Sequence, residues 1–499
     1  MRRLLIIVIC ISSVIVAIAQ SSEEKLLKEF HNIRSEQVNG YAKKLCGVEF
    51  KGRLSGTPEY MNAAHWVADN FSKWGIKPIL SDSSYFQMFN CGYTIRESVG
   101  ELSVLVKDKK GNTIEKTLSF PDDFLPGSNS GSGLIDANIV YVGYGISAPE
   151  LKFDEYKNVD VKGKVVIIES GVPYSGKDKS QIEEWSKYVS AKYKVDNAVS
   201  HGAVAILHVG LVAKPGYPYN ENIVYAHIGD HIVSELFFGT NKKYNYQKSL
   251  IKKSLRPASV EIQHRIKISA ETTHITNGEV CNVIGVIEGS DPILKNEVII
   301  LGAHLDGQGN PGALFPGALD NASGVANVMA TAKALSSMEE KPKRSILFIL
   351  YGGEEEGLLG SGYYADNPLF PLNKTLCVVN MDMVGNGRGF VLTRVDEYPL
   401  LKKHFVESNK NYLHRTLRTS SEKRGEGNPR TDGHLLYNKG YRAFGLWISD
   451  REKTLYYHHP YDTMETLTPE IMEDVSKWMF ISAYNIANDT LIDINNIAK

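Results

Sequence analysis

The sequence predicts an α/β protein with a mostly parallel central sheet flanked by helices, into which a second unit is inserted. Three observations lead to this fold class. From about residue 282 onward, short apolar runs alternate with helical patterns, as in sheets whose parallel strands are joined by helices. From about residue 120 to 260, short strands are instead separated by Gly and Pro. The chain has 499 residues, which is long enough for two or three domains.

The first 19 residues have the pattern of a cleaved signal peptide. Arg2 and Arg3 precede an aliphatic run over residues 4–16, and Ala17 and Ala19 supply the small residues of a cleavage site. This aliphatic run is too short for a stable transmembrane helix. We therefore expect no stable membrane span and a secreted or periplasmic location. The formal net charge is −1, which argues against nucleic acid as a partner.

Four cysteines follow the predicted cleavage site. Their even number in a secreted chain would allow one or two disulfides, but they share no close spacing, so no cysteine zinc cluster is expected. The four are Cys46, Cys91, Cys281 and Cys377.

The first part of the main domain is predicted at residues 20–117, with helices between residues 25 and 89. Trp66, Phe71 and Trp74 belong to a helically spaced apolar pattern in this part. The inserted unit is predicted at residues 118–262. Its elements are strands at 137–144, 164–169 and 204–209 and a helix at 186–200.

Residues 263–499 are predicted to complete the main domain. Its strands are near-continuous apolar runs, as in a sheet that is covered on both faces. A helix over 323–338 carries one apolar stripe. The final helix is predicted to have Pro469 in its first turn. The strands are predicted at 298–301, 345–351, 377–380 and 443–448.

Acidic residues and histidines follow the ends of these strands. Because the carboxyl ends of parallel strands meet at one edge of a sheet, residues far apart in the sequence would converge there. One such residue alone is more often a helix cap or a packed side chain than a ligand. Their joint occurrence, with histidine and carboxylate but no cysteine, favours a divalent metal, most simply zinc. The residues are His304, Asp306, Asp320, Glu354, Glu355, Asp382 and His458.

Five ordered motifs resemble those of the co-catalytic zinc aminopeptidases, a family of bacterial leucyl aminopeptidase and glutamate carboxypeptidase II-like metallopeptidases. They are residues 302–306 (GAHLD), 317–324 (GALDNASG), 354–361 (EEEGLLGS), 380–385 (NMDMVG) and 457–463 (YHHPYDT). Residues 52–57 (GRLSGT) with Tyr60 resemble the family's N-terminal region. The resemblance implies a zinc exopeptidase fold, and it implies that the insertion is a protease-associated domain.

The resemblance also implies the roles of the site residues. Asp320 would bridge two zinc ions per chain, which would share a hydroxide as the nucleophile. His304 and Asp382 would complete one zinc site, and Glu355 and His458 the other. Glu354 would be the general base.

Further roles implied are less central. Asp306, two residues from His304, would hold the other ring nitrogen of that histidine. Tyr457 would polarise the scissile carbonyl, although a packed tyrosine explains it equally well. His459 is a neighbouring imidazole, and the spacing to Asp462 favours His458 as the ligand. The Asp320–Asn321 peptide bond would be cis.

The function expected is hydrolysis of the N-terminal peptide bond of peptides or proteins. Three alternatives stay open: a carboxypeptidase, a one-zinc glutaminyl cyclase, and a receptor-like relative without catalysis. The sequence leaves the preferred side chain, the oligomeric state and the role of the insertion undetermined.

Overall fold

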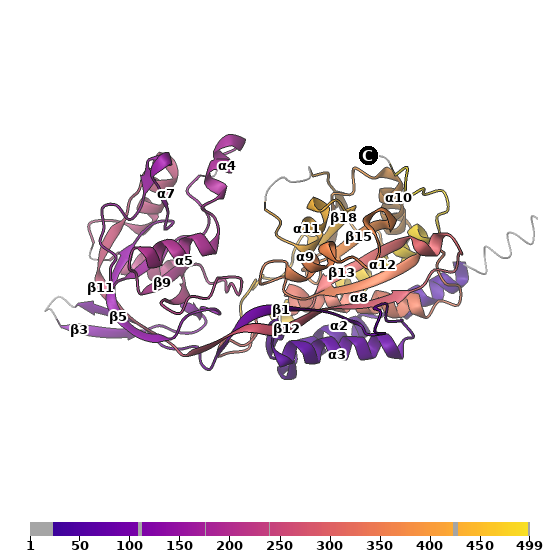
Figure 1. Cartoon of the computed structure of the whole chain (residues 1–499), viewed down its shortest axis with the longest axis horizontal. Helices are drawn as coiled ribbons and strands as arrows, with labels where there is room; N and C mark the ends of the chain where they lie inside the picture. The colour runs from indigo at the N-terminus through magenta and orange to yellow at the C-terminus, as the bar shows by residue number, and fades with distance from the viewer. Residues whose placement is uncertain (1–22, 108–111, 175, 239, 423–427, 498–499) are drawn as a thin grey trace, which may run out of the picture.

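The computed structural model describes residues 23–497 except 108–111, 175, 239 and 423–427. Its described elements form two units, each built around a sheet of eight strands (Figure 1). The predicted signal peptide, residues 1–19, lies outside the described residues. None of the described helices has the length and apolar character needed to cross a bilayer.

The main unit, which corresponds to the predicted main domain, has the strand order β1-β12-β14-β13-β15-β18-β16-β17. The four strands in its middle, β14, β13, β15 and β18, are parallel, and the α/β class with a mostly parallel centre is confirmed. Its strands are β1 (Phe86–Arg96), β12 (Thr272–Ile287), β13 (Val298–His304), β14 (Ser345–Tyr351), β15 (Thr375–Met381), β16 (Gly389–Thr393), β17 (Leu417–Thr419) and β18 (Ala443–Ser449).

Helices cover both faces of this sheet because each face is apolar. One core joins the sheet to α2, α3, α8, α10 and α12, and a second core on the opposite face includes residues of α9 and α11. Trp478 of α12 is fully buried and stacks on Phe390 with ring centroids 4.4 Å apart. The helices are α2 (Ser35–Leu45), α3 (Pro58–Lys73), α8 (Ser323–Ser336), α9 (Leu359–Asp366), α10 (Pro399–Ser408), α11 (Asp432–Asn438) and α12 (Pro469–Asn488).

The inserted unit has the strand order β3-β2-β11-β5-β8-β9-β10-β4. Its strands are β2 (Leu102–Lys107), β3 (Thr113–Thr117), β4 (Phe124–Pro126), β5 (Gly133–Tyr141), β8 (Val165–Ile168), β9 (Ala205–Val209), β10 (Val224–Ile228) and β11 (Val260–Ala270), and a small separate sheet holds β6 (Ser147–Ala148) and β7 (Phe153–Asp154). Its helices are α4 (Lys179–Ser186), α5 (Ala191–Ser200), α6 (Asp230–Leu236) and α7 (Tyr244–Ser254).

The sheet of the inserted unit extends beyond the predicted segment 118–262 on both sides. β2 and β3 precede this segment in the sequence, and most of β11 follows it. All three strands belong to the sheet of the inserted unit, because β11 pairs with both β2 and β5. The ribbon formed by β1 and β12, paired from Phe86↔Val283 to Arg96↔Thr272, leads from one unit to the other (Figure 1).

Two predicted helical regions differ from the structure. The helical region predicted up to residue 89 ends earlier, since β1 begins at Phe86 and pairs with β12. The helix predicted at 186–200 begins later in the structure, because α5 starts at Ala191 and a separate helix, α4, ends at Ser186. Ser190 separates them, because its side chain accepts a hydrogen bond from the Tyr193 amide and caps a new helix.

Candidate active site

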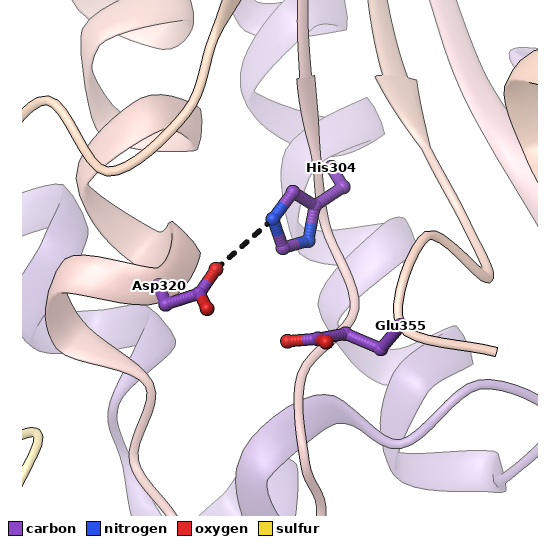
Figure 2. Close-up of side chains that lie close together, drawn as sticks. All are labelled: His304, Asp320 and Glu355. Carbon is purple, nitrogen blue, oxygen red and sulfur yellow. Dashed lines mark ion pairs between the residues drawn. The ribbon is translucent and has the colours of Figure 1, made fainter. Parts of the chain in front are cut away.

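The predicted site residues gather at the carboxyl edge of the parallel strands. His304 ends β13, and Asp382 directly follows β15. Glu354 and Glu355 lie in the loop after β14, and His458 lies in the longer loop after β18. Asp320 stands in the irregular turn that precedes α8. Figure 2 shows the side chains of His304, Asp320 and Glu355 pointing toward one another.

Asp320 lies between the two histidines. Its Oδ1 is 3.1 Å from His304 Nε2, and its Oδ2 is 3.2 Å from His458 Nε2. Each histidine also faces a second carboxylate: His304 Nε2 is 3.6 Å from Asp382 Oδ1, and His458 Nε2 is 2.9 Å from Glu355 Oε2. The five side chains are only 1–11% exposed. We call these five side chains the cluster. It has two arms, His304 with Asp382 and His458 with Glu355, and both arms share the Asp320 carboxylate.

The carboxylates favour protonated histidines in this cluster. Burial alone lowers the pKa of His458, but Glu355 and Asp320 outweigh it and raise this pKa to about 10. The pKa of His304 is likewise raised despite burial, by Glu354 and the three aspartates around it. Burial opposes ionisation of Asp320, yet its hydrogen bonds to both histidines lower its pKa. A cation bound in the cluster would therefore compete with protons for the same nitrogens.

Asp306 holds the loop that carries the two glutamates. Its carboxylate accepts hydrogen bonds from the amides of Glu354, at 3.2 Å, and Glu355, at 3.1 Å. Its Oδ1 lies 3.7 Å from His304 Nδ1, which is longer than a hydrogen bond. Asp306 is thus next to His304, as expected, but its direct bonds go to the β14 loop.

Glu354 projects into a cavity beside the cluster. It is half-buried, and burial is the main cause that raises its pKa well above the usual value for a glutamate. Tyr457 lines the same cavity, is 42% exposed, and stacks on the His458 ring with centroids 3.7 Å apart. His459 instead packs against Tyr456 and Tyr461, and its Nδ1 accepts a hydrogen bond from the Tyr461 amide.

Asp462 and Arg53 position the backbone around Asp320, and sequence reasoning assigned neither a role. Asp462 accepts hydrogen bonds from the amides of Leu319 and Asp320 at 2.9–3.1 Å. Asp462 lies within the 457–463 motif, which was a usable signal. The Asp320–Asn321 peptide bond is cis.

Arg53 is fully buried and donates hydrogen bonds to four backbone carbonyls. Its partners include Leu305, next to His304, at 2.9 Å, and Gly317, just before the turn of Asp320, at 3.1 Å. Arg53 therefore joins the two loops that present His304 and Asp320. Arg53 belongs to the 52–57 motif, but Leu305 and Gly317 are more than 250 residues away from it in the sequence.

Asp432, at the start of α11, is a further acidic residue near the cluster that sequence reasoning missed. It is fully buried, and neither carboxylate oxygen has a hydrogen-bond partner in the described part of the chain. Burial, with Asp306 and Asp382 nearby, raises its pKa to about 7. It is therefore protonated more readily than an ordinary aspartate.

The inserted unit reaches the site through residues 210–217. The Ala213 carbonyl accepts a hydrogen bond from His458 Nδ1 at 2.7 Å, and the Ala213 amide donates to the His458 carbonyl at 3.1 Å. Gly216 packs so closely that a Cβ there would lie 2.9 Å from the Glu355 carbonyl oxygen. Both units thus form the surroundings of the cluster.

The cysteines do not form the disulfides that the sequence allowed. Cys46, Cys91, Cys281 and Cys377 are free thiols. Burial is the main cause that raises the pKa of each to about 12.

The comparisons with known proteins all point to peptidases. The profile of peptidase family M28 matches residues 282–481. Leupeptin-inactivating enzyme 1 of Streptomyces exfoliatus is 35% identical over 176 residues, which are 35% of this chain and 37% of that protein. Aminopeptidase YwaD of Bacillus subtilis is 26% identical over 219 residues, 42% of this chain and 45% of that protein. The chain thus aligns with less than half the length of these relatives.

A solved structure described as a zinc aminopeptidase from Bacillus subtilis shares the fold, with a TM-score of 0.58 at 18% identity. The alignment covers 94% of this chain and 98% of that one. The profile match includes all five motifs of the predicted site, because it runs from β12 into α12. Residues 282–481 therefore form a peptidase family M28 domain, and the resemblance to the co-catalytic zinc aminopeptidases is confirmed at the level of the family.

Proposed function

We propose that this protein is a zinc-dependent aminopeptidase that hydrolyses the N-terminal peptide bond of peptides or proteins. The observation that carries the proposal is the position of Asp320 between His304 and His458, each of which faces a second carboxylate. The names of YwaD and of the zinc aminopeptidase from B. subtilis support it.

The donor set fits two zinc ions. Imidazole nitrogen and carboxylate oxygen are usual zinc ligands, and the cluster is buried, as metal ligands generally are. In the arm of Glu355 and His458, the buried Glu355 Oε1 has no hydrogen-bond partner in the described structure, and His458 Nε2 faces the carboxylates of Asp320 and Glu355 at 3.2 and 2.9 Å. His304, Asp320 and Asp382 would hold one ion, and Asp320, Glu355 and His458 the other. A glutaminyl cyclase that binds one zinc ion would need the ligands of only one of the two arms.

Zinc, when bound, would act as a Lewis acid that lowers the pKa of water and polarises the scissile carbonyl. Glu354 would take the proton from the attacking water and deliver it to the leaving amine. Burial helps Glu354 to hold that proton, because it disfavours the charged carboxylate. The Tyr457 hydroxyl, on the cavity wall, would donate a hydrogen bond to the carbonyl oxygen of the substrate.

The substrate's free α-amino group would lie near Glu354 and Asp382, the carboxylates expected beside the scissile bond. A charged contact of this kind distinguishes an aminopeptidase from a carboxypeptidase, which must instead bind a C-terminal carboxylate. A protein that had lost catalysis would be expected to lack some of these residues, and all are present. Secretion, directed by residues 1–19, belongs to this proposal.

The test compares unmodified and N-acetylated aminoacyl anilides, with zinc measured in the same samples. We expect about two zinc ions per chain, reversible loss of activity with a chelator, and a loss of kcat/KM of roughly 100-fold or more on acetylation. Equal cleavage of acetylated substrates would contradict an aminopeptidase. Full activity without a transition metal would contradict the zinc site.

A further inference from the structure

A cavity of about 410 Å³ lies between the inserted unit and the cluster. One wall carries Glu354, Glu355, Tyr457 and His458 of the main unit. The wall from the inserted unit carries no acidic residue and includes Lys194, His208, Lys214 and Tyr217. Arg430, from the segment before α11, completes the basic side. A group that enters this cavity is therefore adjacent both to the scissile bond and to several cations.

Lys214 has weak partners among the described residues. It is half-buried, and its Nζ has one long hydrogen bond, of 3.4 Å, to the Ser170 hydroxyl. In the described ranges no carboxylate forms an ion pair with Lys214 or with Arg430, although three glutamates line the opposite wall. Burial lowers the pKa of Lys214, and the nearby charge of Arg430 lowers it further. Two cations thus face the cavity without an anion between them.

Lys194 and His208 also line the basic side of the cavity. Lys194 is buried and already donates hydrogen bonds to the carbonyls of Glu169, at 2.7 Å, and Gly171, at 2.6 Å. His208 is 2% exposed, and its Nδ1 has no hydrogen-bond partner in the described structure. A buried polar atom without a partner is costly, so a ligand that bonds to it would be stabilised there.

An anion is the chemistry that would satisfy this wall. Lys214 offers ammonium donors, Arg430 a guanidinium fork, and His208 an N–H donor when Nδ1 carries the ring proton; a carboxylate accepts hydrogen bonds from donors of all three kinds. In a peptide bound to the neighbouring cluster, a carboxylate can come from the first side chain, the second side chain or the C-terminus of a short peptide.

We propose that Lys214 of the inserted unit and Arg430 of the segment before α11 together form a specificity pocket for a substrate carboxylate next to the scissile bond. This inference rests on the proposed peptidase function and deepens it. It assigns the insertion a direct part in the choice of substrate.

Matched substrate pairs would test the pocket in the zinc-loaded, full-length protein. Each pair differs by one charged group: Glu-anilide against Gln-anilide, Ala-Glu-amide against Ala-Gln-amide, and Ala-Gln against Ala-Gln-amide. We expect the acidic member of at least one pair to be preferred by roughly 10-fold or more in kcat/KM, and the preferred pair identifies the source of the carboxylate.

Variants separate the pocket from a general charge effect. Lys214→Met and Arg430→Met should each bring the preferred ratio toward 1, whereas Lys214→Arg should largely keep it. Lys252→Met, which removes an exposed lysine at the end of α7 in the same unit, should leave the ratio as in the wild type. Absence of any preference, or a preference that survives the Lys214→Met/Arg430→Met double variant, would overturn the pocket.

Calorimetric binding of L-glutamate and L-glutamine supplies a readout that needs no turnover. We expect glutamate to bind more tightly, and Lys214→Met to remove the difference. Cleavage of neutral aminoacyl anilides without any acid preference would overturn the pocket and leave the aminopeptidase proposal standing. No cleavage at all, with glutamate binding that depends on Lys214, would overturn the aminopeptidase proposal and keep the pocket; no cleavage and equal binding would overturn both.

Discussion

His458 and Ala213 form two reciprocal hydrogen bonds, one through the imidazole Nδ1 at 2.7 Å and one through the Ala213 amide at 3.1 Å. The carbonyl of Ala213 makes Nδ1 the donor nitrogen and leaves Nε2 directed at Asp320 and Glu355. Such a contact orients the ring and sets its tautomer. Ala213 belongs to the inserted unit, so this unit acts directly on a proposed zinc ligand.

Ala213→Pro should weaken zinc binding, because proline removes the amide that donates to the His458 carbonyl. We expect a loss of affinity of roughly 10-fold for the more weakly held ion, as is usual when a ligand loses its support. Competition with a zinc-binding dye would measure this. Ala213→Gly keeps the amide and is the control. Unchanged zinc affinity in the proline variant would show that the insertion does not support His458.

Substitutions of the adjacent residues Glu354 and Glu355 should have different effects on zinc binding and on the rate. Glu354→Gln should keep its zinc and lose on the order of 100-fold to 10,000-fold in kcat, because the amide cannot take a proton. Glu355→Ala should lose zinc as well, because it removes the carboxylate that faces His458 at 2.9 Å. Metal analysis and steady-state kinetics on both variants would test the assignment. Equal loss of zinc from the two would mean that the roles are wrongly divided.

Asp462→Asn should disturb Asp320 without contacting the substrate. The carboxylate holds the amides of Leu319 and Asp320 with both oxygens, and asparagine offers only one acceptor. We expect zinc affinity to fall by roughly 10-fold to 100-fold while the far-ultraviolet circular dichroism stays native.

Thr466→Val is the control for that change. It removes only the hydroxyl that donates to Asp462 at 3.0 Å and leaves both amide bonds in place. Its zinc affinity should stay close to that of the wild type. A wild-type affinity in Asp462→Asn would show that the turn is held by other contacts.

Glu155 should make the stability of the protein depend on pH. It is buried in the inserted unit, and burial raises its pKa to about 8, although the Tyr144 and Ile146 amides bond to it. The folded state therefore binds one more proton than the unfolded state between the unfolded pKa and about pH 8. This contribution is fully present at low pH and is lost as the pH rises through about 8.

Denaturant unfolding of chelated wild type and Glu155→Gln at pH 6 and pH 8 would measure that contribution. Other buried groups titrate in the same range, so the comparison is the change between the two pH values in each protein. The wild type should lose more stability than the glutamine variant. Equal changes would mean that Glu155 is ionised throughout in the folded protein.

The strands, and the position of the ligand candidates after them, could be predicted from local sequence patterns. β13, β14, β15 and β18 were predictable because a sheet covered on both faces requires continuous apolar runs. His304, Asp320 and Asp382 could be placed at one edge because parallel strands bring their carboxyl ends together. These features follow from local composition and from a general rule of topology.

The contacts that hold and surround the cluster could not be predicted in this way, because they join segments that come together when the chain folds. Arg53 bonds to carbonyls, and His458 bonds to the carbonyl of Ala213; every residue has a carbonyl, so no sequence pattern marks such a partner. The basic wall of Lys214 and Arg430 likewise arises from two segments that are far apart in the sequence. Their closeness depends on the β1 and β12 ribbon and on pairing across the whole chain, which local periodicity does not encode.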